Sequence, residues 1–182
     1  MSESEALVGE HLAIDLVNTR PAGVDLLGTA AQLAHWLRLQ EHRLPEDFAD
    51  PAAAELRAVH DVREHIHAAL TALRRGVRPP AAALRGLSEA LSAAPAVRHL
   101  EWDGERCVAR PRRAGTASAR LAAVLAEAAV DLLTDPAVDR LRQCAAEDCV
   151  MLFVPAHPRR QWCSPERCGN RARVARYYQR HK

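Results

Sequence analysis

The amino-acid sequence predicts a mainly α-helical protein, in which an N-terminal helical domain with one small β-hairpin precedes a small cysteine-rich domain. Aromatic residues make up only 4% of the chain and alanine is abundant, so most of the core must come from closely packed Ala, Leu and Val side chains. Apolar residues recur at helical spacing through most of the chain. Four of the five cysteines lie beyond residue 139, which divides the chain into domains 1–139 and 140–182.

The first two helices are predicted from short patterns. The segment LAIDLVNTR, residues 12–20, is expected to form a short helix because its main apolar residues share one face. Thr29 and Gln32 form a capping box, which predicts the start of a second helix.

The strongest helix signals lie between Asp50 and Gly76. Asp50 can cap the N-terminus, Pro51 occupies the first helical position, and Gly76 follows two arginines as a C-terminal stop. The predicted buried stripe consists of Leu56, Val59, Val62 or Arg63, Ile66 and Leu70.

Further helices are expected over about 80–93 and 118–133, and another is expected to begin at Thr134 and to lead into Cys144. The segment between the helices expected at 80–93 and 118–133 has a different pattern.

The sequence VRHLEWDGERCVAR predicts a β-hairpin. Two alternating runs flank Asp103 and Gly104, a dipeptide typical of a two-residue hairpin turn. Cys107 lies in the second strand, where we expect a small buried side chain.

Charge is distributed unevenly along the chain. Residues 1–139 carry 15 arginines against 20 acidic residues, a net charge of −5, whereas residues 140–182 carry 10 basic against 3 acidic residues, a net charge of +7. The N-terminus lacks a basic leader and no run of 18 apolar residues occurs, so we expect a cytoplasmic protein without membrane contact. Cytosolic thiols stay reduced, which disfavours disulfides.

The C-terminal cysteines have the spacing Cys144-x4-Cys149-x13-Cys163-x4-Cys168. Two thiol pairs at this separation predict a tetrahedral site for one structural Zn²⁺ ion. The alternatives are two disulfides or four unrelated thiols. His157 lies between the pairs and could replace a ligand, although four cysteines already suffice.

The zinc site is expected to organise a treble-clef-like finger. The runs VMLFV and RRQWC flank PAHP, which suggests a short hairpin between the cysteine pairs. Ser164 then caps a helix with Pro165 at its first position, so that Cys168 falls in the first turn.

Arginines on this last helix predict contact with a nucleic acid. Arg173, Arg176 and Arg180 lie within about 60° of one another on a helical wheel, so they form one stripe that could meet phosphates or enter a groove. The side facing the zinc site and the hairpin is expected to carry Cys168, Ala172 and Ala175.

Neighbouring polar residues extend this basic surface. Arg159 and Arg160 are expected at the hairpin tip, while Asn170 and Arg171 either brace the finger or, for Asn170, read a base. The alternative is a solvated basic helix end. The predicted DNA-binding residues are therefore Arg159, Arg160, Asn170, Arg171, Arg173, Arg176 and Arg180.

The motif CGNR at residues 168–171, preceded by WCSPER and LRQCAAEDC, resembles the CGNR zinc-finger family, in which the finger follows a helical domain called the ABATE domain. The resemblance extends to LAIDLVNTR, LAHWL and LLTDPAVDRLRQC and so covers most of the chain. It implies that the four cysteines bind zinc, that the finger binds DNA and that the chain is a stress-induced transcription regulator. One departure follows Phe153, where relatives have an acidic residue and a serine in a slightly longer loop.

Asp15, Asn18 and Thr19 are polar residues inside an apolar run, and the resemblance includes them. They either line a pocket between helices that binds a small-molecule effector, or cap a helix and satisfy buried backbone groups.

Three functions follow from these patterns: a DNA-binding transcriptional regulator, an RNA-binding protein, and a protein-interaction module whose zinc is purely structural. The first is favoured, as a homodimer on paired half-sites, because one short helix gives modest specificity. An enzyme is not expected, because the sequence shows no nucleophile–base pair, no glycine-rich phosphate loop and no open metal site.

Overall fold

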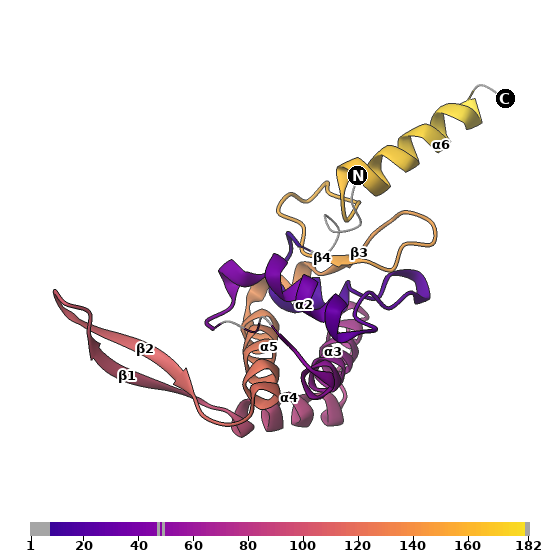
Figure 1. Cartoon of the computed structure of the whole chain (residues 1–182). Coiled ribbons are helices and arrows are strands. Elements are labelled where there is room, and N and C mark those ends of the chain that lie inside the picture. The colour runs from indigo at the N-terminus through magenta and orange to yellow at the C-terminus, as the bar shows by residue number, and fades with distance from the viewer. Residues whose placement is uncertain (1–7, 47, 49, 181–182) are drawn as a thin grey trace.

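The computed structural model describes residues 8–46, 48 and 50–180 of the protein (Figure 1). The described chain is mainly α-helical, as predicted. Its helices are α1 (Leu12–Val17), α2 (Ala30–Leu39), α3 (Ala53–Arg74), α4 (Ala81–Ala93), α5 (Ala117–Thr134) and α6 (Asn170–Arg180). Two antiparallel pairs of strands are β1 (Ala96–Trp102) with β2 (Cys107–Arg113) and β3 (Arg142–Gln143) with β4 (Leu152–Phe153).

The helical core forms where α3, α4 and α5 pack against one another, with α1 lying against α3 and α5 (Figure 1). Every residue of α1 is buried, so this six-residue helix forms part of the core and does not lie on its surface. Trp36 of α2 is also fully buried and joins the same cluster. Within the described residues, no helix combines the length and apolar character needed to cross a membrane.

Helix α3 confirms the predicted stripe and its C-terminal stop, but it begins at Ala53 and so later than expected. The carboxylate of Glu55 accepts the N–H of Ala52 at 2.8 Å, so an acid in the first turn caps the helix instead of Asp50. The helix ends at Arg74, and Gly76 has a φ of 68°, the left-handed conformation that glycine adopts most easily. The stripe is buried at Val59, Val62, Arg63, Ile66 and Leu70, with Leu56 partly buried.

Strands β1 and β2 form the predicted hairpin, which projects away from the helices (Figure 1). The turn is centred one residue later than expected, on Gly104 and Glu105, because the carboxylate of Asp103 accepts the N–H groups of Glu105 and Arg106 at 2.9 Å. Gly104 supplies the positive φ of 108°. Cys107 is exposed, and the expectation that it is buried was wrong because, among the described residues, the strands of this hairpin contact chiefly each other.

The segment after α5 differs from the expected helix. A 3₁₀ turn covers Pro136–Arg140, capped by the Asp135 carboxylate, and the chain then extends into β3. The helix ends here because Leu141 adopts an extended conformation and β3 pairs with β4.

The hairpin of the finger encloses the first cysteine pair and not the PAHP segment, so its predicted position was wrong. Pro155 and Pro158 lack the N–H groups that a strand ladder needs. The loop they occupy is held by Arg142, which donates hydrogen bonds to the backbone carbonyls of Pro158 and Arg160.

The helical domain and the finger meet at β4. The side chain of Asn18 donates to the carbonyl of Leu152 at 2.9 Å and accepts the N–H of Leu152 at 2.8 Å, with both residues buried. Two residues further on, the N–H of Val154 donates to the Glu10 carboxylate at 3.2 Å. Because backbone groups two residues apart face the same edge of a strand, Asn18 and Glu10 together act as a third strand for β4. We call these contacts the β4 seam.

The β4 seam predicts a large effect of Asn18→Ala. The substitution leaves the N–H and C=O groups of Leu152 buried without partners, so the free energy of unfolding should fall by about 2–4 kcal/mol. Urea denaturation of the zinc-loaded chain measures this loss. Asn170→Ala is a matched control, since Asn170 is exposed and its loss should change stability by less than about 0.5 kcal/mol. Equal stabilities of the two variants would contradict the role assigned to Asn18.

Candidate metal centre

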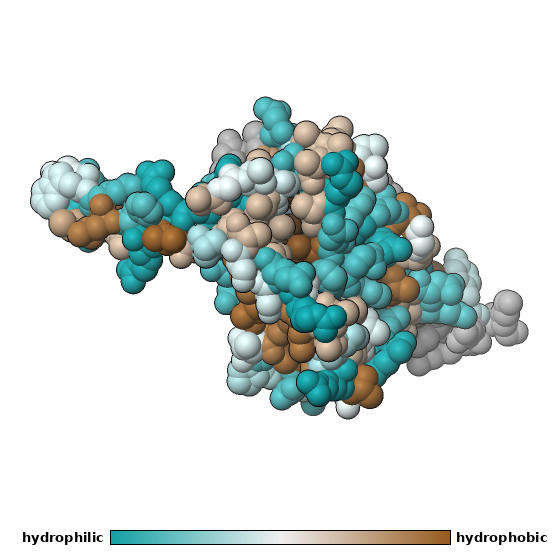
Figure 2. All heavy atoms as spheres, turned by 90° about the horizontal axis from the view of Figure 1, so that it is seen from below, coloured by the Kyte–Doolittle hydropathy of each residue, from teal (hydrophilic) through white to brown (hydrophobic). Residues whose placement is uncertain are grey.

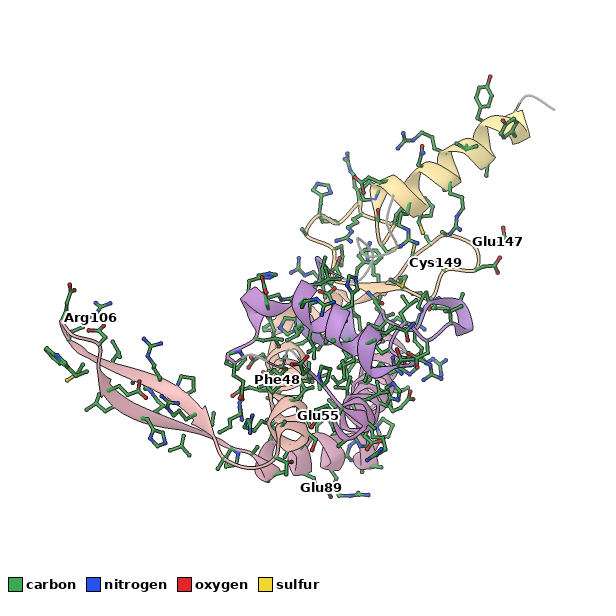
Figure 3. The ribbon with its side chains drawn as sticks, viewed as in Figure 1. Phe48, Glu55, Glu89, Arg106, Glu147 and Cys149 are labelled. Atoms are coloured by element: carbon green, nitrogen blue, oxygen red, sulfur yellow. The ribbon has the colours of Figure 1, made fainter. Side chains whose placement is uncertain are left out.

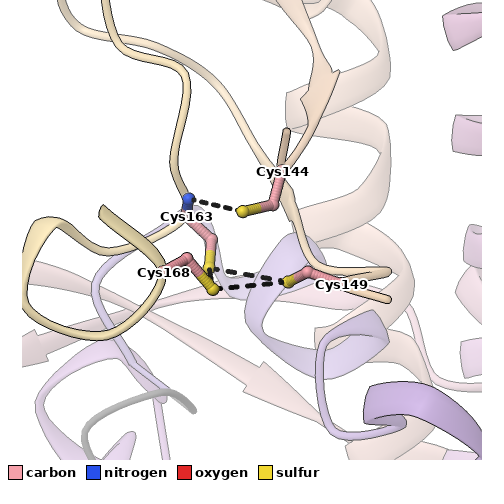
Figure 4. Close-up of side chains that lie close together, drawn as sticks. All are labelled: Cys144, Cys149, Cys163 and Cys168. Carbon is pink, nitrogen blue, oxygen red and sulfur yellow. Dashed lines mark hydrogen bonds between the residues drawn. The ribbon is translucent and has the colours of Figure 1, made fainter. Parts of the chain in front are cut away.

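Two loops bring the four predicted cysteines together (Figure 4). Cys144 follows β3, and Cys149 lies at the end of the loop that returns the chain to β4, beside Glu147 (Figure 3). Cys163 precedes Ser164, and Cys168 lies in the following turn, Pro165–Gly169. All four sulfur atoms lie within 4.8 Å of one another.

The sulfur positions fit a zinc ion. The Sγ atoms of Cys149, Cys163 and Cys168 are separated by 3.6, 3.7 and 3.9 Å. A tetrahedron with Zn–S bonds of about 2.3 Å places its sulfur atoms about 3.8 Å apart. The four cysteines can therefore bind one zinc ion, with every corner of the tetrahedron filled by sulfur. His157 lies outside this cluster, and its Nδ1 accepts the N–H of Arg159.

Local sequence explains how the loops reach this geometry. Asp148 adopts a φ of 61°, a conformation that aspartate tolerates better than most residues, and this turns the chain back toward Cys149. Ser164 caps the second loop by accepting the N–H of Arg167 at 3.2 Å, as predicted. Gly169 lies close to Trp162: a Cβ there would be 3.1 Å from the ring, so a larger residue would require the ring to shift.

Two N–H groups point at the sulfur atoms. The backbone N–H of Cys163 lies 3.3 Å from the sulfur of Cys144, and the guanidinium of Arg171 lies 3.5 Å from the sulfur of Cys168. Such donors stabilise thiolate charge and orient the ligands of a metal.

When no metal ion is bound, burial opposes ionisation of the cysteine thiols. Burial raises the pKa of Cys149 to about 11, with a further contribution from the neighbouring cysteines. Burial likewise raises the pKa of Cys163, to which Cys149 and Cys168 add. At Cys144 burial also raises the pKa, but backbone N–H groups of Ala146 and Cys163 outweigh it, so that this pKa is lowered. Zinc binding must therefore expel protons from at least Cys149 and Cys163.

The zinc affinity should accordingly depend steeply on pH. Each thiol that ionises only on binding contributes about tenfold per pH unit, so two such thiols predict an affinity that falls about a hundredfold for each unit of pH decrease. Competition with a chromophoric chelator at several pH values measures this slope. Cys163→Ser should weaken binding, whereas Cys107→Ser, outside the cluster, should not. A pH-independent affinity would show that the thiols are already ionised in the free protein.

The predicted DNA-binding residues do not all share one surface. Arg159, Asn170, Arg171 and Arg173 are exposed, and the side chains of Arg176 and Arg180 lie outside the described residues. Helix α6 projects from the finger, packing mainly on the turn before it (Figure 1). Ala172 is half-buried, but Ala175 is exposed and does not face the zinc site as expected, because the helix has already left the finger.

The guanidinium of Arg160 points inward. It donates to the Glu10 carboxylate and to the carbonyl of Cys163, both at 2.6 Å, and stacks 4.4 Å from the centre of the Phe153 ring. It also donates to the carbonyl of Trp162 at 3.0 Å. Contact between Arg160 and DNA stays a prediction.

Asp15 has partners within the helical domain. Its carboxylate accepts the N–H groups of Gly9 and Glu10 at 3.2 and 3.0 Å and pairs with Arg43 at 2.6 Å. Burial raises its pKa, against the opposing effect of Arg43. Gln40 donates a further hydrogen bond to it.

Thr19 belongs to another group of buried polar side chains, separate from the partners of Asp15. Its hydroxyl donates to the carbonyl of Leu16 at 2.6 Å and accepts from Arg63, which is 3% exposed and pairs with Asp25. The hydrogen bonds from Arg63 lower the pKa of Asp25. Asp15, Asn18 and Thr19 thus all satisfy internal hydrogen bonds, and whether any also binds a ligand stays a prediction.

A cleft of about 730 Å³ separates the helical domain from the finger. Its lining includes Asp15 and Asn18 of the helical domain and Cys149, Val150 and Arg167 of the finger, but not Thr19. The cleft therefore borders the zinc site directly.

Three residues were missed by sequence analysis. Glu10 bridges Val154 and Arg160, Arg142 holds the proline-containing loop, and Arg167 is exposed beside the start of α6. Arg167 could have been found, since it lies four residues before Arg171 and thus on the same helical face. No local signal marks Glu10, whose partners lie 144 and 150 residues away.

The fold and the site together define a helical protein with a C-terminal four-cysteine zinc finger. Residues 10–136 match the ABATE family, described as "Putative stress-induced transcription regulator", and residues 140–181 match the CGNR zinc finger. The chain therefore belongs to the ABATE family and carries a CGNR finger, as the motifs predicted. Neither is an enzyme family. A comparison with curated proteins finds no match.

Proposed function

We propose that the finger binds duplex DNA through α6, and that the chain is a transcriptional regulator in the cytoplasm, where its thiols stay reduced. The observation that carries this proposal is the helix α6, which projects from the finger (Figure 1). Its arginines at 171 and 173 are exposed to solvent. Zinc and four thiolates together lower the net charge of residues 140–182 from +7 to +5, so the finger remains strongly cationic. An α-helix fits the major groove, and arginines bind phosphates and guanines.

The metal centre supports binding over catalysis. Four sulfur ligands fill the tetrahedron, whereas a catalytic zinc keeps an open position for water or substrate. The role of the ion is then to hold the two loops together and to fix the start of α6.

Salt dependence tests the contact with phosphates. Neutralising three to five phosphates predicts a slope of about −3 to −4.5 in a plot of log affinity against log salt concentration, and Arg173→Ala should make it about 0.9 less steep. Fluorescence anisotropy with a labelled duplex measures both values. Arg57→Ala is the matched control, because Arg57 is exposed on α3 in the helical domain. Equal slopes for both variants would exclude Arg173 from the interface.

Sequencing the fragments of genomic duplex DNA that the protein retains then distinguishes a sequence-specific regulator from a non-specific polyanion binder. A recurring motif that is retained by the zinc-loaded chain and lost by Arg173→Ala/Arg176→Ala would identify a sequence-specific regulator. Uniform retention would favour a non-specific binder, and no retention would favour a protein-interaction module with structural zinc.

RNA is the second candidate ligand because of two aromatic residues on α6. Tyr177 and Tyr178 are 59% and 64% exposed and lie edge to face at 5.8 Å. Exposed aromatic rings beside arginines can stack on unpaired bases. Competition between duplex DNA and structured RNA discriminates the two.

We also propose a homodimer on paired half-sites, and a small-molecule effector in the cleft beside the zinc site. An effector there would touch the helical domain and the finger together. It should raise the melting temperature of the wild-type chain but not of Val150→Trp, which narrows the cleft, in a thermal-shift screen of small molecules. Equal stabilisation of both proteins would place the effector elsewhere.

A further inference from the structure

The hairpin formed by β1 and β2, here called the arm (residues 96–113), has two chemically different faces. Residues that pair directly across an antiparallel ladder share a face. One face therefore carries Trp102 opposite Cys107, Leu100 opposite Ala109 and Arg98 opposite Pro111. Leu100 and Trp102 are 75% and 66% exposed, and Figure 2 shows hydrophobic residues along the arm. We call this the apolar face of the arm.

The opposite face carries a network of ion pairs, although Val97 and Val108 also lie on it. Glu101 pairs with Arg112 at 2.7 Å and with Arg110 at 3.6 Å. An apolar face backed by an ion-paired face is the pattern of a sheet that is covered on one side and solvated on the other.

Within the described chain, little covers the apolar face. The arm is anchored at its base, where Arg113 donates to the carbonyl of Ala94 and pairs with Glu127. Beyond this point β1 and β2 contact chiefly each other. An isolated two-stranded hairpin is marginally stable in water, and packing against a helix is one way to stabilise it.

We propose that the apolar face packs on α4 of a second copy of this chain, and that the second arm packs reciprocally on the first α4. Seven-residue strands span about 23 Å. The 13 residues of α4 span about 20 Å, so the two elements match in length. A reciprocal contact of this kind is the two-fold arrangement most common in homodimers.

Charge favours a second copy as the occupant. The arm carries 5 arginines against 3 acidic residues, whereas the rest of residues 1–139 carries 10 arginines against 17 acidic residues. Arg98 lies in the apolar face, and no ion pair of the described residues includes it. Glu89 is the acidic residue of α4 and points away from the helical core (Figure 3). Arg98 of one copy can therefore pair with Glu89 of the other.

Nucleic acid is a poorer occupant of the arm. The arm projects from the end of the molecule opposite α6 (Figure 1). Four of its five arginines already have acidic partners: Arg106, Arg110, Arg112 and Arg113. This inference rests on the proposed homodimer and names its surface. The oligomeric state that tests it is measured without DNA, so its failure leaves the proposal on DNA binding through α6 intact.

Sedimentation velocity of the zinc-loaded full chain provides the test. The wild-type chain should be a dimer at micromolar concentration, and Leu100→Ser and Trp102→Ser should be monomers. Val97→Ser is the matched control, since Val97 is 55% exposed on the opposite face and should not affect dimerisation. Circular dichroism should show the same helix content in all variants, because the arm contributes little to the helical core.

A charge exchange tests the assignment to α4. Arg98→Glu should weaken the dimer about tenfold, and Arg98→Glu/Glu89→Arg should restore it. A monomeric wild-type chain, or a dimer indifferent to Leu100→Ser and Trp102→Ser, would overturn the proposal. If Arg98→Glu weakens the dimer and Arg98→Glu/Glu89→Arg does not restore it, α4 is not the partner surface. A monomer whose DNA affinity falls on Arg98→Ala would make the arm a nucleic-acid contact instead.

Discussion

The position of the finger depends on the free edge of β4. Strand β3 satisfies one edge of this two-residue strand, and Asn18 and Glu10 satisfy the other with their side chains. Leu152 is at the same time part of the hydrophobic core of the helical domain. A short strand thus has hydrogen bonds on both edges and apolar contacts to the core. It covers α1 together with α3 and α5, so α1 is buried along its whole length.

The sulfur cluster and the β4 seam stabilise the finger from two sides. Its own buried core is small and consists of Phe153 with Cys144 and Cys168. Arg160 connects the two sides, because one guanidinium contacts Glu10, the Phe153 ring and the carbonyl of Cys163. The turn that carries Cys168 leads directly into α6, so the direction of that helix is set by the metal centre and by α1 together.

Local patterns predicted most of the helices and the metal site, because capping residues, apolar periodicity and cysteine spacing act over short distances. What they could not predict depends on distant partners. Arg160 was expected on a basic surface, but Glu10 draws it inward across 150 residues. Cys107 was expected to be buried because cysteine commonly packs as a small apolar side chain, yet the residue type does not tell whether a hairpin packs on the core. Proline positions, which were available in the sequence, argued against a hairpin at PAHP.

The β4 seam also limits how far the finger can be treated as a portable module. Residues 140–182 contain all four sulfur ligands, but two of the groups that complete β4 belong to residues 10 and 18. A fusion that transfers only the C-terminal segment to another protein would keep the metal ligands and lose the partners of Leu152 and Val154. A chimaeric protein built from this chain therefore needs the segment from Glu10 to Asn18, and the helices that bury it, together with the finger.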